Sequence, residues 1–252
     1  MFFVLKRNKL IVIIIALVMI AISVSIFSVY AIETDALAKR LVPIYSVETT
    51  ENKVALTFDC AWGADKTRSI MDAIENAGYK CTFFVTGFWV DANGELVKEI
   101  VSRGHQIGNH SDNHPHMGKA SDQTVRSEID NVNSKIEALV GEKPSCFRAP
   151  FGEYDNKLLN TLSTRNMLCI QWSIDSLDWK GITGSEIAKR VINRLKSGDI
   201  VLFHNNSDHI LDALPLVLSA IKNKGLNAVR VDELVYFANY VINAEGKQIK
   251  NS

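Results

Sequence analysis

Two kinds of hydrophobic pattern alternate along the chain from Lys53 onward. Short, nearly continuous apolar runs predict buried strands at residues 54–58, 81–85, 106–108, 145–148, 167–172, 200–203 and 227–229. Apolar residues spaced three or four apart predict helices at residues 67–77, 95–103, 124–140, 156–165, 185–195, 210–224 and 232–238. Strands that alternate with helices are typical of a parallel sheet with right-handed crossovers. The pattern therefore predicts an α/β fold, a single closed or nearly closed (β/α) barrel of about seven parallel strands.

The N-terminal part has a different pattern. Residues 10–32 form a run without a charged side chain, long enough as a helix to cross the hydrocarbon core of a bilayer. Lys6, Arg7 and Lys9 precede this run, which favours a cytoplasmic N-terminus with the rest of the chain outside. A buried core helix is disfavoured because the run has no polar face. Its length favours a retained anchor, whereas small residues near its end favour a cleaved signal peptide.

These patterns divide the chain into four segments. We expect a basic tip with a membrane anchor or signal peptide at 1–32, a linker at 33–52, the barrel at 53–240 and a polar tail at 241–252. Hydrophobic residues make up 47% of the chain, enough for one sizeable core. We expect a monomer.

Charge argues against a nucleic-acid-binding protein, and cysteine placement argues against a disulfide-stabilised fold. The formal net charge is zero, and three of the 28 basic residues precede the first acidic one, so 28 − 3 = 25 basic groups face 28 acidic groups in the remainder. A nearly neutral domain gives no electrostatic reason to bind nucleic acid. Cys81, Cys146 and Cys169 lie in apolar, strand-like segments, which indicates free core thiols rather than disulfides.

Charged and titratable residues follow several of the predicted strands. Each lies where a strand ends or just after it: Asp59, His110, Arg148, Asp175 and His204. The carboxyl ends of the strands share one rim of a βα barrel, so these side chains converge there. Loops are polar in any protein, but this does not explain why two His, two Asp and one Arg fill these places. The rim is the candidate active site.

Two of the histidines have the spacing of a metal site. His110 and His114 are four residues apart, and on a helical turn both would lie on one face and bind one divalent ion. Pro115 follows directly, so such a turn must be short. His105 and His116 lie nearby, and a histidine-rich surface loop is the alternative interpretation.

Five ordered motifs resemble those of the NodB-homology polysaccharide deacetylases, carbohydrate esterase family 4. They are Thr57-Phe58-Asp59, His110-Ser111-x-x-His114, Arg148-Ala149-Pro150-Phe151-Gly152, Asp175-x-x-Asp178-Trp179 and Leu202-Phe203-His204. The resemblance extends over residues 53–236. Three further segments resemble the PdaB-like branch, which is linked to sporulation in Gram-positive bacteria: Trp62-Gly63, Gly87-Phe88-Trp89 and His204-Asn205-Asn206.

The resemblance implies a role for each motif residue. Asp59 would be the general base on a metal-bound water, and Arg148 would fix its orientation. His204 would protonate the departing amine, with Asp175 as the carboxylate that keeps it protonated. His110 and His114 would bind a divalent metal, with zinc expected. Three residues would contact the substrate: Trp179, Leu202 and Phe151. Trp172 is interpreted as ordinary barrel packing.

Cys60 departs from the family pattern. The first motif of the family usually ends in a second aspartate, the third metal ligand, and Cys60 stands there in this chain. A Cys60 thiolate would complete a zinc site of two His and one Cys with an open position. The alternative is a thiol aimed elsewhere, leaving a weak two-histidine site or none. Asp65 and Asp112 are possible substitutes that no spacing argument selects.

The resemblance thus implies a hydrolase that removes N-acetyl groups from a cell-wall glycan, either peptidoglycan or a chitin-like chain, with a role in sporulation. The N-terminal pattern places it outside the membrane. A glycan-binding or structural wall protein with weakened or lost catalysis is the alternative, favoured by Cys60. Asp59, Arg148, Asp175 and His204 favour the enzyme, because binding alone needs no acid and base. A hydrolase of other small amides or esters is a third possibility.

Overall fold

The computed structural model describes residues 11, 14–25 and 40–251, in two compact units, Met1–Arg40 and Leu41–Ser252. In the first unit, residues 14–25 are helical. The predicted span at 10–32 lies partly outside the described residues, as do Lys6, Arg7 and Lys9. Within the described residues, no helix is both long and apolar enough to cross a membrane.

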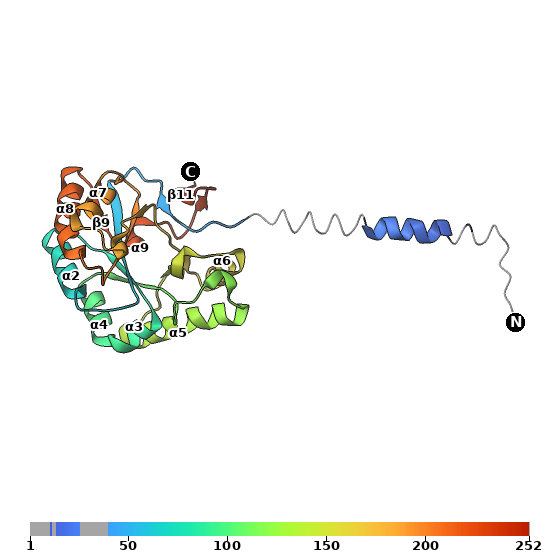
Figure 1. Ribbon diagram of the computed structural model, residues 1–252, viewed down its shortest axis with the longest axis horizontal. Helices are drawn as coiled ribbons and strands as arrows, with labels where there is room; N and C mark the ends of the chain where they lie inside the picture. The colour runs from blue at the N-terminus through green and yellow to red at the C-terminus, as the bar shows by residue number, and fades with distance from the viewer. Residues whose placement is uncertain (1–10, 12–13, 26–39, 252) are drawn as a thin grey trace. The chain divides into compact units, whose positions relative to one another are not determined.

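The second unit is built on an eight-stranded parallel sheet in the order β6-β5-β4-β3-β2-β8-β7, with β9 pairing the first residues of β2 (Figure 1). Its strands are β2 (Lys53–Cys60), β3 (Thr82–Val85), β4 (Gln106–Asn109), β5 (Cys146–Phe147), β6 (Leu168–Cys169), β7 (Ile174–Asp175), β8 (Ile200–His204) and β9 (Asn227–Val229). The predicted parallel α/β barrel is confirmed in its class and in the order of its elements.

The strands β6 and β7 explain the difference between seven predicted strands and eight observed ones. They stand at the two ends of the sheet, yet only residues 170–173 separate them in the chain. Leu168–Cys169 pairs with β5, and Ile174–Asp175 pairs with β8. One extended segment therefore passes from one end of the sheet to the other without a helix, and the barrel is deformed there.

The helices lie where the spacing of apolar residues predicts them, except α3, which is absent from the prediction. They are α2 (Thr67–Asn76), α3 (Gly87–Ala92), α4 (Gly94–Ser102), α5 (Asp122–Val140), α6 (Asn156–Ser163), α7 (Gly184–Ile192), α8 (Ile210–Asn223) and α9 (Val231–Leu234), with 3₁₀ turns η1 (Met117–Lys119), η2 (Pro150–Gly152) and η3 (Asp178–Lys180). Helix α3 has only six residues, too few to show a period. Thr86 fixes its start by accepting a hydrogen bond from Trp89 N.

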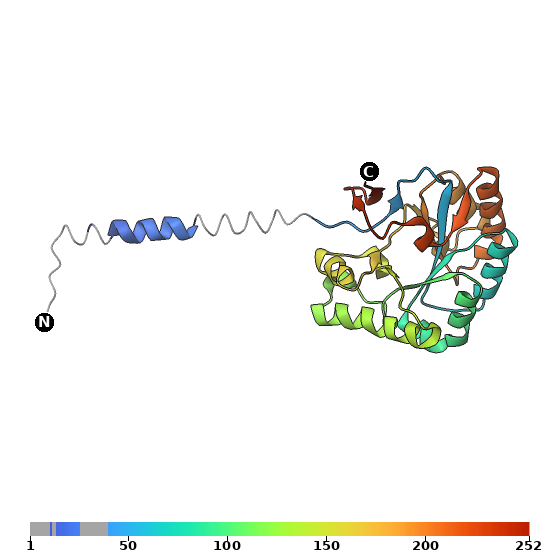
Figure 2. The same ribbon diagram turned by 180° about the vertical axis from the view of Figure 1, so that it is seen from behind.

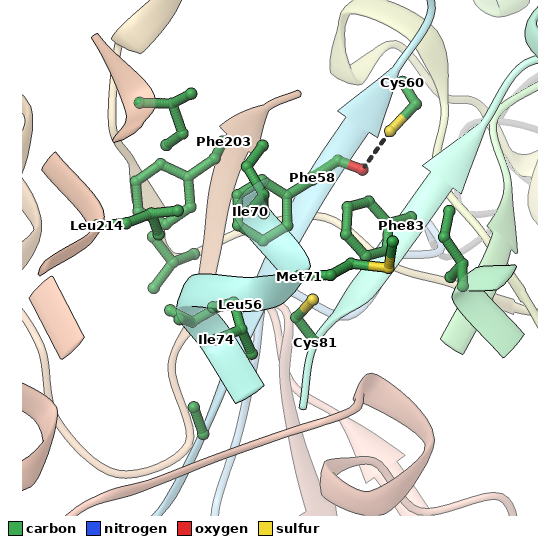
Figure 3. Packing of buried hydrophobic residues seen from close by; sticks show 14 of the residues in the cluster. Leu56, Phe58, Cys60, Ile70, Met71, Ile74, Cys81, Phe83, Phe203 and Leu214 are labelled. Atoms are coloured by element: carbon green, nitrogen blue, oxygen red, sulfur yellow. Dashed lines mark hydrogen bonds between the residues drawn. The ribbon is translucent and has the colours of Figure 1, made fainter. Parts of the chain in front are cut away.

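The main core lies between the sheet and the helices. Phe58 of β2 stacks between Phe83 of β3 and Phe203 of β8, with ring centroids 5.3 and 5.5 Å away (Figure 3). Leu56, Phe58 and Cys60 share this face of β2 because side chains alternate along a strand. Thr57 and Asp59 therefore face the opposite side, toward the barrel interior.

A second, three-stranded sheet joins the two ends of the folded unit. It has the order β1-β11-β10, with β1 (Ser46–Val47), β10 (Tyr240–Ile242) and β11 (Lys247–Lys250) (Figures 1 and 2). Ile44, 1% exposed, also bridges Ile170. The folded unit thus begins at Leu41 rather than Lys53, and part of the predicted polar tail forms two of its strands.

Candidate active site

A cavity of about 500 Å³ lies at the carboxyl ends of the strands. Its lining combines most of the residues predicted for the site with several others: Asp59, Ala61, Trp62, His110, His114, Ala149, Phe151, Trp172, Asp175, Trp179, Leu202, His204 and Asn206. Two predicted site residues, Arg148 and Cys60, are not part of this lining. Both are fully buried, but on different sides of β2.

Arg148 is buried outside the cavity lining and fixes the position of the Asp59 carboxylate. Its Nη1 donates to Asp59 Oδ1 and to Thr57 Oγ1, each at 2.8 Å. Its Nη2 and Nε donate to the carbonyls of Gln171 and Ile170, at 3.1 and 3.3 Å. Because the guanidinium makes four contacts, it fixes one orientation of the carboxylate. Arg148 thus lies where the predicted orienting residue should be.

The surroundings of Asp59 keep its carboxylate ionised. Burial works to raise the pKa of Asp59, but the charges of Arg148, His110 and His204 lower it below its ordinary value. The net result is an anionic carboxylate in the cavity at neutral pH. Such a group can accept a proton from a neighbouring water.

His110 and His114 come together without a helical turn. Their ring centroids are 4.9 Å apart, but Ser111 and His114 have positive φ angles of 68° and 56°. The expectation of a helical turn is wrong, because these left-handed residues form a loop instead. Asn109 Oδ1 accepts from Ser111 N at 2.8 Å and fixes the start of this loop.

Burial favours the neutral form of both imidazoles. Burial lowers the pKa of His110 below its ordinary value, and burial together with the charge of His110 lowers the pKa of His114 to about 4. His110 Nδ1 lies 2.9 Å from the carbonyl of Arg148 and so carries its proton, which leaves Nε2 free, 3.5 Å from Asp59 Oδ2. In their neutral forms, two imidazoles in this arrangement are suitable metal ligands.

Cys60 does not join them. Its side chain lies in the main hydrophobic core, fully buried, with Sγ 3.7 Å from the Phe58 carbonyl (Figure 3). Burial and the charge of Asp59 raise the pKa of this thiol well above its ordinary value. Within the described part of the chain, no three His, Cys, Asp or Glu side chains form a group that could hold a metal. The complete ligand set predicted for zinc therefore does not fit this site.

The two acidic substitutes for Cys60 are absent from the cavity lining. Asp112 accepts from Lys135 Nζ at 2.7 Å and from Asn131 Nδ2 at 3.0 Å, so it ties the His110–His114 loop to α5. Asp65 is exposed.

His204 is held by Asp178 rather than Asp175. Its Nδ1 lies 2.8 Å from Asp178 Oδ1, and its backbone N donates to Asp178 Oδ2 at 2.8 Å. The expectation that Asp175 fills this place is wrong, because Asp175 Oδ1 accepts from Leu177 N at 2.9 Å. Burial works to lower the pKa of His204, but Asp178, with Asp59 and Asp175, raises it above its ordinary value. His204 is therefore suited to donate a proton.

Replacing Asp178 with Asn should move the alkaline limb of the activity profile to lower pH. His204 acts as an acid only when protonated, and its raised pKa keeps it protonated to higher pH. Without the Asp178 charge that pKa falls, and activity at alkaline pH should drop by up to about 10²-fold. Asp212→Asn is the control, because Asp212 lies 3.1 Å from Nδ1 of His209, which is half-buried and does not line the cavity. Identical pH profiles for wild type and Asp178→Asn would refute this role.

Apolar and aromatic side chains form the remaining wall. Trp179, Leu202 and Phe151 line the cavity, where the substrate-binding residues were predicted. Trp172 lines it too, which contradicts its interpretation as packing alone. Trp62, which was quoted from the sequence only for its resemblance to a family branch, also lines the cavity. It comes two residues after the end of β2, and this position at a strand end is the signal that could have placed it here.

Comparison with known proteins agrees with this site. A family model described as polysaccharide deacetylase matches residues 46–169. A peptidoglycan-N-acetylglucosamine deacetylase of Bacillus cereus is 32% identical over 198 residues, covering 77% of this chain and 92% of that protein. YlxY of Bacillus subtilis, an uncharacterised protein, is 32% identical over 193 residues, covering 77% of this chain. The match spans only 60% of the length of YlxY.

Two solved structures share the fold. A peptidoglycan N-acetylglucosamine deacetylase has a TM-score of 0.74 at 29% identity, covering 77% of this chain and 92% of that one. A pseudoenzyme of carbohydrate esterase family 4 from Bacillus anthracis has a TM-score of 0.74 at 28% identity, covering 83% and 73%. A mutant of that pseudoenzyme is described as having restored enzymatic activity. Sequence, fold and site together show that this chain belongs to the polysaccharide deacetylase family.

Proposed function

We propose that this protein removes N-acetyl groups from a cell-wall glycan of the peptidoglycan type. The observation that carries the proposal is the pairing of two dyads at one cavity: Asp59 with Arg148, and His204 with Asp178. Amide hydrolysis needs a base for the attacking water and an acid for the leaving amine. The apolar side chain of Leu202 offers a surface for the acetyl methyl group. Relatives named peptidoglycan-N-acetylglucosamine deacetylases support this substrate class.

The reaction follows from the protonation states of these groups. Asp59, ionised and held by Arg148, accepts a proton from the water that attacks the acetyl carbonyl. His204, protonated through Asp178, donates a proton from Nε2 to the amine nitrogen as the C–N bond breaks, giving acetate and a free amino sugar. Incubating the full chain with purified peptidoglycan should release acetate, and a His204→Gln variant should release far less. No acetate from the wild-type chain would contradict the proposal.

We propose zinc as a weakly held metal, bound through His110 and His114 alone. Because the Cys60 thiol points into the core, Cys60→Ser should leave zinc affinity nearly unchanged, whereas His110→Ala with His114→Ala should abolish it. Cys81→Ser is the matched control, since Cys81 is a buried thiol of the same core cluster. Titration of these variants with zinc measures their affinities for the metal. A clear loss of affinity in Cys60→Ser alone would restore the thiolate ligand.

A second candidate function is glycan binding with weakened or lost catalysis. The core position of Cys60 favours it, as does the likeness to the Bacillus anthracis pseudoenzyme. The two functions separate in one assay. Acetate release by the wild-type chain supports the enzyme, whereas its absence, with release gained in Cys60→Asp, supports the binding protein.

We propose that the glycan site faces outside the membrane, on the sequence evidence of an uncharged span at 10–32 preceded by basic residues. Protease added to intact cells should then digest residues 41–251, and full protection would contradict this location.

We also propose a role in sporulation, on the resemblance of three segments to the PdaB-like branch. Unaltered glycan acetylation in spores of a deletion strain would count against it.

A further inference from the structure

Trp62 is the first large side chain after β2, and it is 59% exposed while lining the cavity. Phe151 and Trp179, each 58% exposed, line the same cavity. Single exposed apolar residues are common, but several aromatic rings gathered at one site mark a binding surface. Neither dyad of the proposed reaction uses Trp62.

Buried side chains fix the backbone beside Trp62. The carbonyl of Gly63 accepts from Trp89 Nε1 at 2.7 Å and from Asn205 Nδ2 at 2.8 Å, and both donors are at most 2% exposed. Asn205 Nδ2 also donates to Thr67 Oγ1 at 3.2 Å. Two buried donors on one carbonyl hold this loop in place before a ligand arrives, which reduces the entropy lost on binding.

The Gly63 carbonyl is also where the three PdaB-like segments of the sequence meet. Trp62-Gly63 follows β2, Trp89 belongs to α3, and Asn205 follows β8. Their convergence gives these segments one shared physical effect, which is to hold Trp62 at the rim of the cavity.

Trp62 and Phe151 flank His114. Their ring centroids lie 5.2 and 4.7 Å from that of His114, and both rings meet the imidazole edge to face, at 64° and 72°. The two exposed rings and the imidazole therefore form a short row along the cavity. A sugar with its acetyl group near Asp59 would place its neighbours in the glycan beside this row.

We propose that Trp62 is a platform for a second sugar ring of the glycan, next to the ring that is deacetylated. This inference rests on the proposed function. The ligand class is a β-linked oligosaccharide of N-acetylated sugars, because a pyranose has an apolar C–H face that packs on an indole. The site would then discriminate a chain from a single sugar, and Trp62 would determine that specificity.

Calorimetric titration of the full chain in detergent, with N-acetylglucosamine and with its β-1,4-linked hexamer, tests the inference. Wild type should bind the hexamer more tightly than the single sugar. Trp62→Ala should weaken hexamer binding by about tenfold and bring the ratio of the two affinities toward one. Trp62→Phe, which keeps an aromatic face, should retain most of the preference. Phe237→Ala is the control, because Phe237 is 48% exposed and lines a different cavity.

Three results would overturn the inference. An equal loss for both ligands in Trp62→Ala would mean that Trp62 only positions His114. Equal affinities of wild type for both ligands would remove the second sugar contact, yet leave the proposed function intact. If wild type binds neither ligand, the proposed function falls along with the inference.

Discussion

Arg148→Met is expected to destabilise the folded barrel by about 3–5 kcal/mol, the cost typical of removing one partner of a buried ion pair. Arg148 is fully buried and donates to Asp59, Thr57 and two backbone carbonyls. Its guanidinium also lies 4.2 Å from the centroid of the Phe84 ring. A methionine would fill part of the volume and leave all four acceptors without this donor. Urea unfolding of the two proteins measures the difference.

The loss should depend on pH with a definite sign. The pKa of Asp59 is lowered in the folded state, so the ion pair stabilises above the unfolded pKa, and this stabilisation is lost as pH falls through the folded pKa. The destabilisation by Arg148→Met should therefore be largest at neutral pH and shrink in acid.

Arg165→Met is the matched control for Arg148→Met. Arg165 makes two 2.6 Å contacts with Asp130, but the Asp130 side chain is 52% exposed. Exposed pairs contribute about 1 kcal/mol or less. Equal losses of unfolding free energy in the two variants would show that burial does not strengthen the contribution of the Arg148–Asp59 pair.

Asp59→Asn should reduce deacetylation by about 10²-fold or more, because the amide cannot accept a proton from water. Its oxygen still accepts from Arg148, so the variant keeps that hydrogen bond although it loses the charge of the buried pair. Binding of the glycan hexamer then shows that the variant is folded. Acetate release and calorimetric titration measure the two properties separately.

Asp175→Asn is the comparison for Asp59→Asn. Asp175 lines the same cavity, but its Oδ1 caps the backbone N of Leu177 instead of holding His204. A smaller loss than in Asp59→Asn is expected. Wild-type turnover in Asp59→Asn would mean that another group activates the water.

The sequence was sufficient to predict the barrel and the place of the active site. Parallel strands bring residues such as Asp59, His110 and His204 to one end of the barrel, independently of loop conformation. It also contained the answer for Cys60. Alternation along β2 puts Thr57 and Asp59 on the cavity side, and so puts Cys60 in the core. The family motif suggested a metal ligand at Cys60, whereas the two-residue alternation of β2 places Cys60 on the face opposite the cavity.

Loop geometry accounts for the other errors. Asp175 and Asp178 are three residues apart, and the choice between them depends on the turn at Leu177, whose φ is 55°. Likewise, the approach of His110 to His114 depends on positive φ at Ser111. Neither Leu177 nor Ser111 is a glycine, so the residue types do not predict the left-handed backbone at these two positions.

The three-stranded sheet has a consequence for the order in which the protein is built. The partner of Ser46 and Val47 is β11, which contains Lys247 and Gln248. During synthesis β1 therefore leaves the ribosome before the barrel strands, whereas β11 leaves it only after them. Closing so long a loop is entropically costly and is repaid only after the barrel has compacted the chain between. Until then the edge of β1 that pairs with β11 lacks this partner, and an unpaired strand edge can pair with another molecule.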